Sequence, residues 1–248
     1  MVMIEKFIRE YPIRSYECDK NGQLRLITLL NIFQDAADSH ANEMGLGYDF
    51  CRSKGLAWVG SNYHIKISRL PKWYESIKII TWPCEERRLG AIRDFRVEDE
   101  QGNTIITAAS QWILIDFGKK RPVSLREHLP EYQIISERAL ETSFDKLPDP
   151  VQISTQVTFK VRYDDIDVNK HINNAVYPLW ATEAVDDNFR LSHTPQEIEI
   201  AFKKEGHYGE VVETRTEMDG LTSLHSICAV SDGRELARIR INWANIES

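Results

Sequence analysis

The sequence predicts an α+β fold of two tandem copies, each an antiparallel sheet wrapped around a long central helix. Three observations lead to this prediction. A long apolar pattern with helical spacing is followed by several extended segments, the same order of elements recurs in the second half, and a polar stretch with several prolines separates the halves. An antiparallel sheet commonly buries one face, and wrapping it around the helix gives each copy a core.

The first copy opens with an extended segment at residues 5–17. Residues 26–44 carry apolar side chains at the spacing of one helix face, and Gly45 and Gly47 mark the end of this helix. The apolar positions are Leu26, Leu29, Leu30, Phe33, Ala37 and Met44. Four extended segments follow at 58–69, 75–87, 91–99 and 104–116, with a hairpin turn at 99–103.

A polar segment at residues 118–150 separates the copies, and its four prolines predict an irregular interdomain linker with one short helix. The second copy then restarts with a strand at 153–163 and a helix near 175–188. Its further strands are expected at 196–204, 210–218, 222–231 and 235–244, with a hairpin turn at 231–234. The predicted domains are therefore 1–117 and 151–248.

The composition is that of a soluble globular protein and excludes several classes of function. Of the 248 residues, 42% are hydrophobic, and no run of 18 apolar residues is present to cross a membrane. The four cysteines are far apart, which argues against a metal site and for reduced thiols in the cytoplasm. No signal or transit peptide is recognisable, and a net charge of −7 disfavours nucleic-acid binding. We expect neither a metal nor a cofactor.

The most informative stretch is residues 165–174, a polar loop directly before the second predicted helix. It holds two carboxylates, a carboxamide and an imidazole, namely Asp165, Asp167, Asn169 and His171. Such a loop can direct acid–base groups into an apolar pocket, although Asp and Asn side chains also simply cap turns and helices. A calcium-binding loop is excluded, because its required Gly and Glu positions hold Lys170 and Val176.

The two copies differ where chemistry is expected. Sliding the sequence by 147 residues places Leu24 under His171, and sliding it by 135 residues places Leu70 under Glu205. The first copy would thus carry apolar side chains where the second carries an acid–base pair. If these positions served only the fold, the same requirement would act on both copies and would favour similar side chains in them. We therefore expect the second copy to perform chemistry and the first to bind substrate or serve as a scaffold.

Residues 165–174 resemble the Asp-Leu-Asp-Val-Asn-Gln-His-Val-Asn-Asn signature of the fatty acyl-acyl carrier protein thioesterases of plants and bacteria, and Trp180 fits the helix after it. Residues 202–205, Phe-Lys-Lys-Glu, resemble the downstream Tyr-Arg-Arg-Glu motif of that family. The similarity covers nearly the whole chain. It implies a tandem double hotdog fold and hydrolysis of acyl-acyl carrier protein, which releases free fatty acid and terminates fatty acid synthesis.

By matching position, the resemblance implies catalytic roles for Asp167, Asn169, His171 and Glu205. Plant members commonly carry Cys after the glutamate, whereas this chain has Gly206 and no cysteine near either motif, so a thiolate nucleophile is not expected. The absence of a transit peptide fits a bacterial cytoplasmic enzyme. If Glu205 continues a strand, it can turn into an apolar pocket, where burial raises the pKa of a carboxyl toward that of a useful base. Two routes stay open: Glu205 could activate a water, or Asp167 could attack the thioester to give a transient anhydride.

The resemblance also suggests where substrate and partner would bind. Residues of the first copy that could line an acyl pocket, or equally pack its core, are Leu29, Leu30, Phe33, Trp58 and Ile65. The basic residues best suited to an acidic acyl carrier protein are Arg87, Arg88, Lys119, Lys120 and Arg121. The alternatives are an acyl-CoA thioesterase of the hotdog type and, less favoured, a non-catalytic acyl-thioester binding protein. The sequence leaves chain-length preference and a homodimer open.

Overall fold

Two compact units make up the described part of the chain. The computed structural model describes residues 6–246, which divide into a first unit that ends at Ser143 and a second that begins at Phe144. This boundary falls inside the segment predicted to be a linker. No helix within residues 6–246 combines the length and the apolar character needed to cross a membrane.

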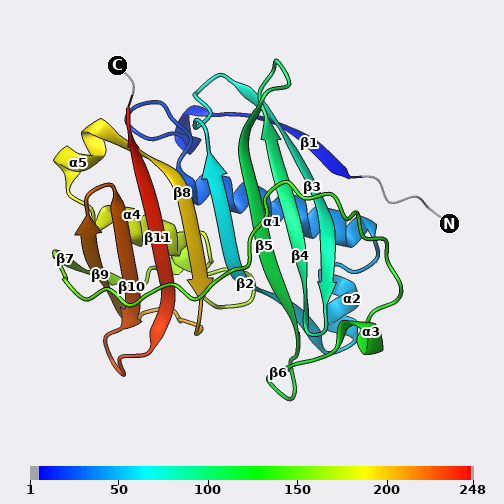
Figure 1. The fold of residues 1–248 in the computed structure, drawn as a ribbon. Coiled ribbons are helices and arrows are strands. Elements are labelled where there is room, and N and C mark those ends of the chain that lie inside the picture. The colour runs from blue at the N-terminus through cyan, green and yellow to red at the C-terminus, as the bar shows by residue number, and fades with distance from the viewer. Residues whose placement is uncertain (1–5, 247–248) are drawn as a thin grey trace. The chain divides into compact units, whose positions relative to one another are not determined.

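An antiparallel sheet in the order β1-β3-β4-β5-β2 forms the first unit (Figure 1). Its strands are β1 (Phe7–Pro12), β2 (Leu56–Ile67), β3 (Ser76–Arg87), β4 (Gly90–Glu98), β5 (Thr104–Asp116) and the short β6 (Arg121–Pro122). Its helices are α1 (Leu26–Glu43), α2 (Tyr48–Ser53) and α3 (Leu125–His128), with a 3-10 turn, η1, at Ser15–Glu17. The first predicted strand ends early, at Pro12, and the other predicted elements of this copy are present.

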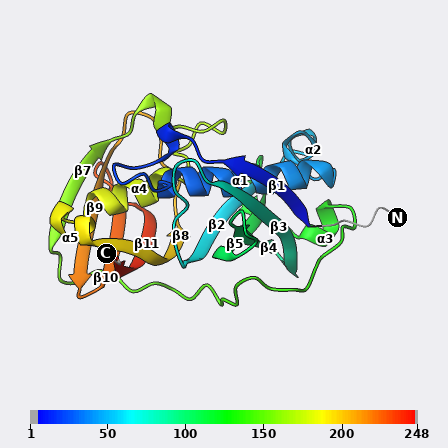
Figure 2. The same cartoon turned by 90° about the horizontal axis from the view of Figure 1, so that it is seen from above.

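The core of the first unit lies between α1 and one face of its sheet. The buried residues of α1 recur at the spacing of one helix face, so the helix is stabilised by packing against the strands. Phe33 stacks on Phe95 of β4 with ring centroids 4.6 Å apart. The strand register places Phe95 beside Ala108 of β5 and, one strand further, Ile65 of β2. Figure 2 shows α1 running across the strands on this side.

The short helix α2, which the sequence analysis did not anticipate, closes one end of the first unit. Its residue Cys51 is buried in a cluster with Leu46, Leu56 and Leu114, and Trp58 packs partly buried against that cluster. Cys51 is the one buried residue of α2. A helix with a single buried position leaves no repeated apolar spacing in the sequence, so periodicity could not reveal it.

The second unit repeats the plan with a sheet in the order β8-β11-β10-β9-β7. Its strands are β7 (Thr155–Lys160), β8 (His193–Phe202), β9 (Val211–Asp219), β10 (Thr222–Ala229) and β11 (Glu235–Asn245), with a 3-10 turn, η2, at Tyr163–Asp165. The prediction of one helix near 175–188 is wrong, because the chain forms α4 (Val176–Glu183) and α5 (Asp187–Ser192). Asp186 separates them, since its side chain accepts the N–H groups of Asn188 and Phe189 and caps α5.

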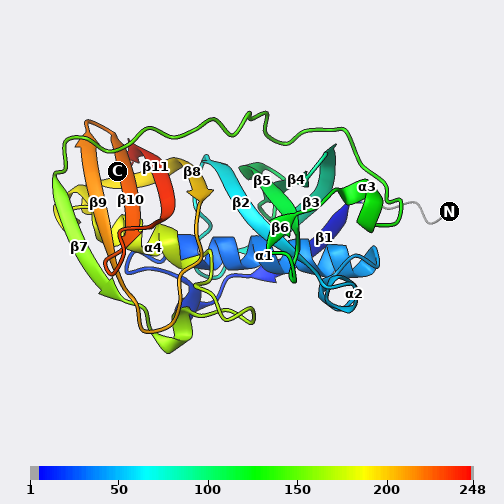
Figure 3. The ribbon, with the colours of Figure 1, turned by 90° about the horizontal axis from the view of Figure 1, so that it is seen from below.

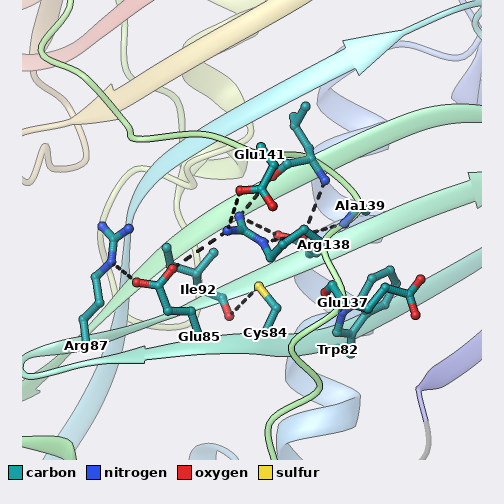
Figure 4. Close-up of polar contacts among 11 residues, drawn as sticks. Trp82, Cys84, Glu85, Arg87, Ile92, Glu137, Arg138, Ala139 and Glu141 are labelled. Carbon is teal, nitrogen blue, oxygen red and sulfur yellow. Dashed lines mark hydrogen bonds and ion pairs between the residues drawn. The ribbon is translucent and has the colours of Figure 1, made fainter.

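Between α3 and β7 the chain has no regular helix or strand, yet it is fixed to the sheet in each unit. In the first unit the carboxylate of Asp94, which is fully buried on β4, accepts hydrogen bonds from Arg138 at 3.0 Å and from the N–H of Ala139 at 2.7 Å. Figure 4 labels Arg138 and Ala139 of this segment, together with Glu85 and Ile92 of the neighbouring strands. Figure 3 shows this segment on the sheet face opposite α1. In the second unit Arg238 of β11 binds the side chain of Asp149 and the carbonyl of Pro148.

Candidate active site

The motif loop, residues 166–172, is closed at its base by the backbone and held at its centre by one carboxylate. Its first and last residues form an antiparallel bridge, and the N–H of Asp167 donates to the carbonyl of His171 at 2.9 Å. The Oδ1 atom of Asp167 accepts the N–H groups of Asn169 at 2.8 Å and of His171 at 3.2 Å. This aspartate turn orders the loop from within, so Asp167 fixes the backbone that carries His171.

Glu205 lies on a second loop, which is packed tightly against the motif loop. The N–H of Ile172 donates to the carbonyl of Gly206 at 2.9 Å. A Cβ atom at residue 206 would lie 2.3 Å from Cδ1 of Ile172, so the absence of a side chain lets the two loops approach. The expectation that Glu205 continues a strand and turns into an apolar pocket is wrong. Strand β8 ends at Phe202, and the Glu205 side chain is 62% exposed.

The two loops bring His171 and Glu205 together. The Nε2 atom of His171 lies 3.3 Å from Oε2 of Glu205, and the imidazole is about half as exposed as the carboxylate. The backbone of Glu205 is also held, because its carbonyl accepts a hydrogen bond from Nε of Arg234 at 3.4 Å. Arg234 in turn pairs with Glu210 and Asp232. The contact of Arg234 with Glu205 could not be predicted from sequence, since it depends on how the turn between β10 and β11 folds back.

The other two polar residues of the motif have different surroundings. Asp165 is 2% exposed, and its carboxylate accepts a hydrogen bond from Arg162 at 2.7 Å, so its charge is balanced within the loop. Asn169 is exposed, and its side chain forms no hydrogen bond with any of residues 6–246. The amide of Asn169 is therefore open to a bound molecule, whereas the carboxylate of Asp165 is not.

Two further side chains adjoin the pair, and neither belongs to the sequence motifs. The ring of His207 stands edge-on to that of His171, with ring centroids 5.3 Å apart. Tyr177 of α4 is buried beside Phe202. Burial, and secondarily the nearby charge of Glu210, raises the pKa of the Tyr177 phenol, so this hydroxyl stays protonated at neutral pH.

The first unit contains the same loop, and its hydrogen bonds correct the alignment made from the sequence. Oδ1 of Asp19 accepts the N–H groups of Asn21 at 2.8 Å and of Gln23 at 3.0 Å. The carboxylate in the motif loop of the second unit makes the same two bonds, to the residues two and four positions further on. His171 therefore corresponds to Gln23, and its pairing with Leu24 is wrong by one residue.

The contact between the loops is repeated as well. In the first unit the N–H of Leu24 donates to the carbonyl of Pro71, and in the second unit the equivalent bond ends on the residue after Glu205. The counterpart of Glu205 is thus Leu70, as the sequence alignment had it. The first unit keeps the aspartate turn but has Gln23 and Leu70 in place of the imidazole and the carboxylate. Of the two equivalent pairs of loops, only the pair in the second unit carries a histidine and a glutamate.

The residues proposed to line an acyl pocket fall into two groups in the first unit. Leu29, Leu30, Phe33 and Ile65 are buried where α1 faces the sheet. Trp58 lies apart from them, against the cluster around α2. Their burial is what either a packed core or a pocket lining requires, so acyl binding by these five residues stays a prediction.

The basic residues proposed to bind a carrier protein lie at one end of the first unit. Arg87 ends β3 and Arg88 follows it in the turn, while Lys119 and Lys120 lie in the turn after β5 and Arg121 begins β6. The turn after β3 is bonded to β5, because the N–H of Leu114 donates to the carbonyl of Leu89. Two of the charges are paired locally, Arg87 with Glu85 at 2.7 Å and Lys119 with Asp116 at 3.2 Å. Carrier binding here stays a prediction.

Neither a metal nor a thiol is suggested by the side chains around the pair. Within residues 6–246 no group of three or more His, Cys, Asp or Glu side chains is arranged to hold a metal ion. The four cysteines are free, and the position after Glu205 is Gly206, which offers no thiol. The two loops themselves offer a carboxylate, an imidazole and a carboxamide.

Two family models match the chain: the acyl-ACP thioesterase N-terminal domain over residues 4–132 and the acyl-ACP thioesterase C-terminal domain over residues 149–245. An acyl-[acyl-carrier-protein] hydrolase of Cuphea viscosissima is 27% identical over 98% of this chain and 65% of its own length. An oleoyl-acyl carrier protein thioesterase of Coriandrum sativum is 28% identical over 90% of this chain and 65% of its own length. The chain thus spans just under two thirds of the length of these relatives.

Solved structures resemble the chain over nearly its whole length. The 12:0-ACP thioesterase from Umbellularia californica aligns with a TM-score of 0.85 at 24% identity, covering 97% of this chain and 98% of that one. An acyl-ACP thioesterase from Bacteroides thetaiotaomicron aligns with a TM-score of 0.85 at 20% identity, covering 96% and 97%. These likenesses confirm the predicted tandem double hotdog fold.

Proposed function

This chain belongs to the acyl-ACP thioesterase family, and on that premise we propose that it hydrolyses acyl thioesters of acyl carrier protein and releases the free fatty acid. The observation that carries the proposal is the contact of His171 with Glu205, 3.3 Å apart, on two loops held together by their backbones. The equivalent loops of the first unit carry Gln23 and Leu70 instead. The chemistry is therefore assigned to the second unit.

In the proposed reaction Glu205 is the general base. Its carboxylate takes a proton from a water molecule as the water oxygen bonds to the thioester carbonyl carbon. His171 lies within hydrogen-bonding reach of the Glu205 carboxylate and orients it. The amide of Asn169 donates a hydrogen bond to the developing oxyanion. The carbon–sulfur bond then breaks, and the proton held by Glu205 passes to the departing thiolate.

Asp167 is assigned a positioning role in this proposal. Its Oδ1 atom already accepts two backbone N–H groups, and Asp19 makes the same two bonds in the unit that lacks the acid–base pair. An aspartate in this turn is thus explained by loop structure alone. This favours the general-base route over attack by Asp167 and formation of an anhydride.

The acyl chain is assigned to the first unit, where Phe33 of α1 stacks on Phe95 of β4 against the sheet. Strand registers place Phe95 opposite Thr81 in the first unit and His225 opposite Thr216 in the second. His225 is fully buried and hydrogen-bonded to Thr216 at 2.9 Å, so methylene groups at this place would displace a polar network. The first unit also buries a polar network, in which Arg93 binds His40 and Thr81. Phe33 and Phe95 nevertheless offer an apolar surface against which methylene groups can pack.

The test is to offer the purified protein a panel of acyl-acyl carrier protein and acyl-CoA thioesters of varied chain length and to measure free thiol. We expect release from acyl-acyl carrier protein at a higher kcat/KM than from acyl-CoA. Preference for acyl-CoA across the panel would favour an acyl-CoA thioesterase. Binding of either thioester without thiol release would favour a non-catalytic binding protein.

A further inference from the structure

Lys170, in the motif loop of the second unit, has a backbone conformation that normally selects glycine. Its φ is 66°, and the equivalent position in the first unit is Gly22, with φ 73°. A side chain in this left-handed region is strained, whereas glycine adopts it freely. The second unit therefore carries a lysine at the position where the same turn of the first unit has glycine. Strain that persists beside reactive groups is a reason to look for a function of the side chain.

The surroundings of Lys170 leave its charge available. Lys170 is exposed and forms no ion pair with any other residue between 6 and 246, and the same holds for Lys204, next to Glu205 on the second loop. Asp164, exposed at the start of the same segment, offsets part of this charge. Two lysines without an ion-pair partner therefore stand beside the acid–base pair, in a chain whose net charge is −7, although Asp167 and Glu205 lie at the same two loops.

Apolar side chains are exposed beside these lysines. Tyr163 is 80% exposed, Val168 84% and Tyr208 64%, and the two tyrosine rings meet edge to face at 6.1 Å. The loop hydrogen bonds of the two units place Ser15 at the position of Tyr163 and Lys20 at that of Val168. The apolar character of both positions is thus confined to the active copy. Exposed apolar side chains beside unpaired lysines are typical of an interaction surface.

We propose that this rim, formed by Tyr163, Val168, Lys170, Lys204 and Tyr208, is the surface on which the acidic acyl carrier protein docks. The inference rests on the proposed function, because it names the carrier of the thioester hydrolysed at the same loops. The thioester arm must reach His171, and the rim is fixed to His171 within one unit. Lysines at the edge attract the acidic carrier, while the exposed tyrosines and valine supply apolar contact.

The test compares Lys170→Gly with the parent on acyl-acyl carrier protein and on acyl-pantetheine, a thioester with neither carrier nor phosphate. We expect the KM for the carrier substrate to rise about ten-fold relative to that for acyl-pantetheine at low salt, and this ratio to approach unity at high salt. Because glycine relieves the strained φ, the unfolding temperature of Lys170→Gly should rise. Tyr163→Ser, which installs the residue of the first unit, should raise the same KM ratio.

A charge reversal of Arg88, Lys120 and Arg121 in the first unit is the matched comparison. A raised KM ratio in that variant, with an unchanged ratio in Lys170→Gly, would overturn the rim as the docking surface. If Lys170→Gly raised the KM for acyl-acyl carrier protein and for acyl-pantetheine equally, the rim would likewise be ruled out as the docking surface. Hydrolysis of acyl-pantetheine by the parent separates the proposed hydrolysis from the proposed docking surface. If the parent releases no thiol from either substrate, the proposed function fails, whereas altered KM ratios concern docking alone.

Discussion

Glu205 is exposed and His171 partly buried, and the positions of both side chains are fixed by the backbone that carries them. Each lies on a loop whose N–H and carbonyl groups are bonded to the other loop or to an aspartate. The resemblance of the two motifs was enough to single out both residues, and the structure brings them into contact, while their catalytic roles stay a prediction. The contact of Arg234 and the correction from Leu24 to Gln23 could not be predicted, because both depend on hydrogen bonds seen only in the folded chain.

Asp167 allows a direct choice between the two hydrolytic routes. Asn at this position keeps an oxygen that can accept the N–H groups of Asn169 and His171, whereas Ala does not. We expect Asp167→Asn to retain turnover within about ten-fold of the parent and Asp167→Ala to lose roughly a hundred-fold or more, the scale of a misplaced acid–base group. Steady-state thiol release measures both. Equal loss in the two variants would support attack by Asp167.

Gly206 is expected to be required for the approach of the two loops. A Cβ atom there would meet Cδ1 of Ile172 at 2.3 Å, so Gly206→Ala should lower the free energy of unfolding by about 1–3 kcal/mol and reduce turnover. Ile172→Val removes that Cδ1 atom. The double variant should therefore recover stability and turnover in part, as denaturant unfolding and thiol release would measure. If the double variant is no better than Gly206→Ala, this contact is not what excludes a side chain.

At the scale of elements, the strands followed from alternation and turn signals, but the role of the segment after α3 did not. The four prolines and polar composition predicted an irregular linker, and the segment is irregular. Composition could not show that it is bonded to the sheets, because Asp94 and Arg238 lie within strands, where a buried charge has no sequence signature. The break between α4 and α5 was missed for a similar reason, since Asp186 reads equally well as a helix surface residue.

The segment after α3 should contribute to stability through Asp94. Asp94→Ala leaves the Arg138 guanidinium and the N–H of Ala139 without their acceptor, at a cost of about 3–5 kcal/mol in the free energy of unfolding. Arg138 also reaches Glu141, which is largely exposed, so Glu141→Gln is the control and should change stability by less than about 1 kcal/mol. Urea unfolding of both variants measures this. A small effect of Asp94→Ala would mean that the segment is dispensable for folding.

On the scale of the whole molecule, one fold is used twice with different interiors and different loops. Each unit buries a polar network, around Arg93 and His40 in the first and around His225 in the second, whereas the His171–Glu205 contact lies in the second unit. Predicting a division of labour needed only the sequence difference at Leu70 and Glu205. The polar interior of the second unit was not predicted, because a Ser, Thr or His in a strand does not reveal which face it occupies until the register is known.

Buried His225 should make the chain sensitive to acid. Burial lowers the pKa of His225 to about 3, and burial together with the charge of Arg93 lowers that of His40 to about 4. The unfolded chain therefore binds these protons first. The contribution of these neutral histidines to the free energy of unfolding is complete above pH 6.5, the ordinary pKa of histidine. It is lost as the pH falls toward the lowered pKa values. Each histidine contributes a slope of at most roughly 1.4 kcal/mol per pH unit.

Urea unfolding of the parent and of His225→Asn between neutral pH and about pH 4 measures this contribution. The variant should show a shallower loss of stability than the parent, while His207→Gln, at an exposed position, should follow the parent. Parallel profiles for the parent and His225→Asn would mean that His225 does not resist protonation in the folded chain.

The acid–base pair of the second unit is tested most directly by the turnover of Glu205→Gln on acyl-acyl carrier protein. Glu183→Gln, an exposed carboxylate of α4 in the same unit, is the matched control. We predict that Glu205→Gln loses roughly two or more orders of magnitude in kcat at an unchanged unfolding temperature, while Glu183→Gln keeps parental turnover. Near-parental turnover of folded Glu205→Gln would contradict the assignment of Glu205 as the base.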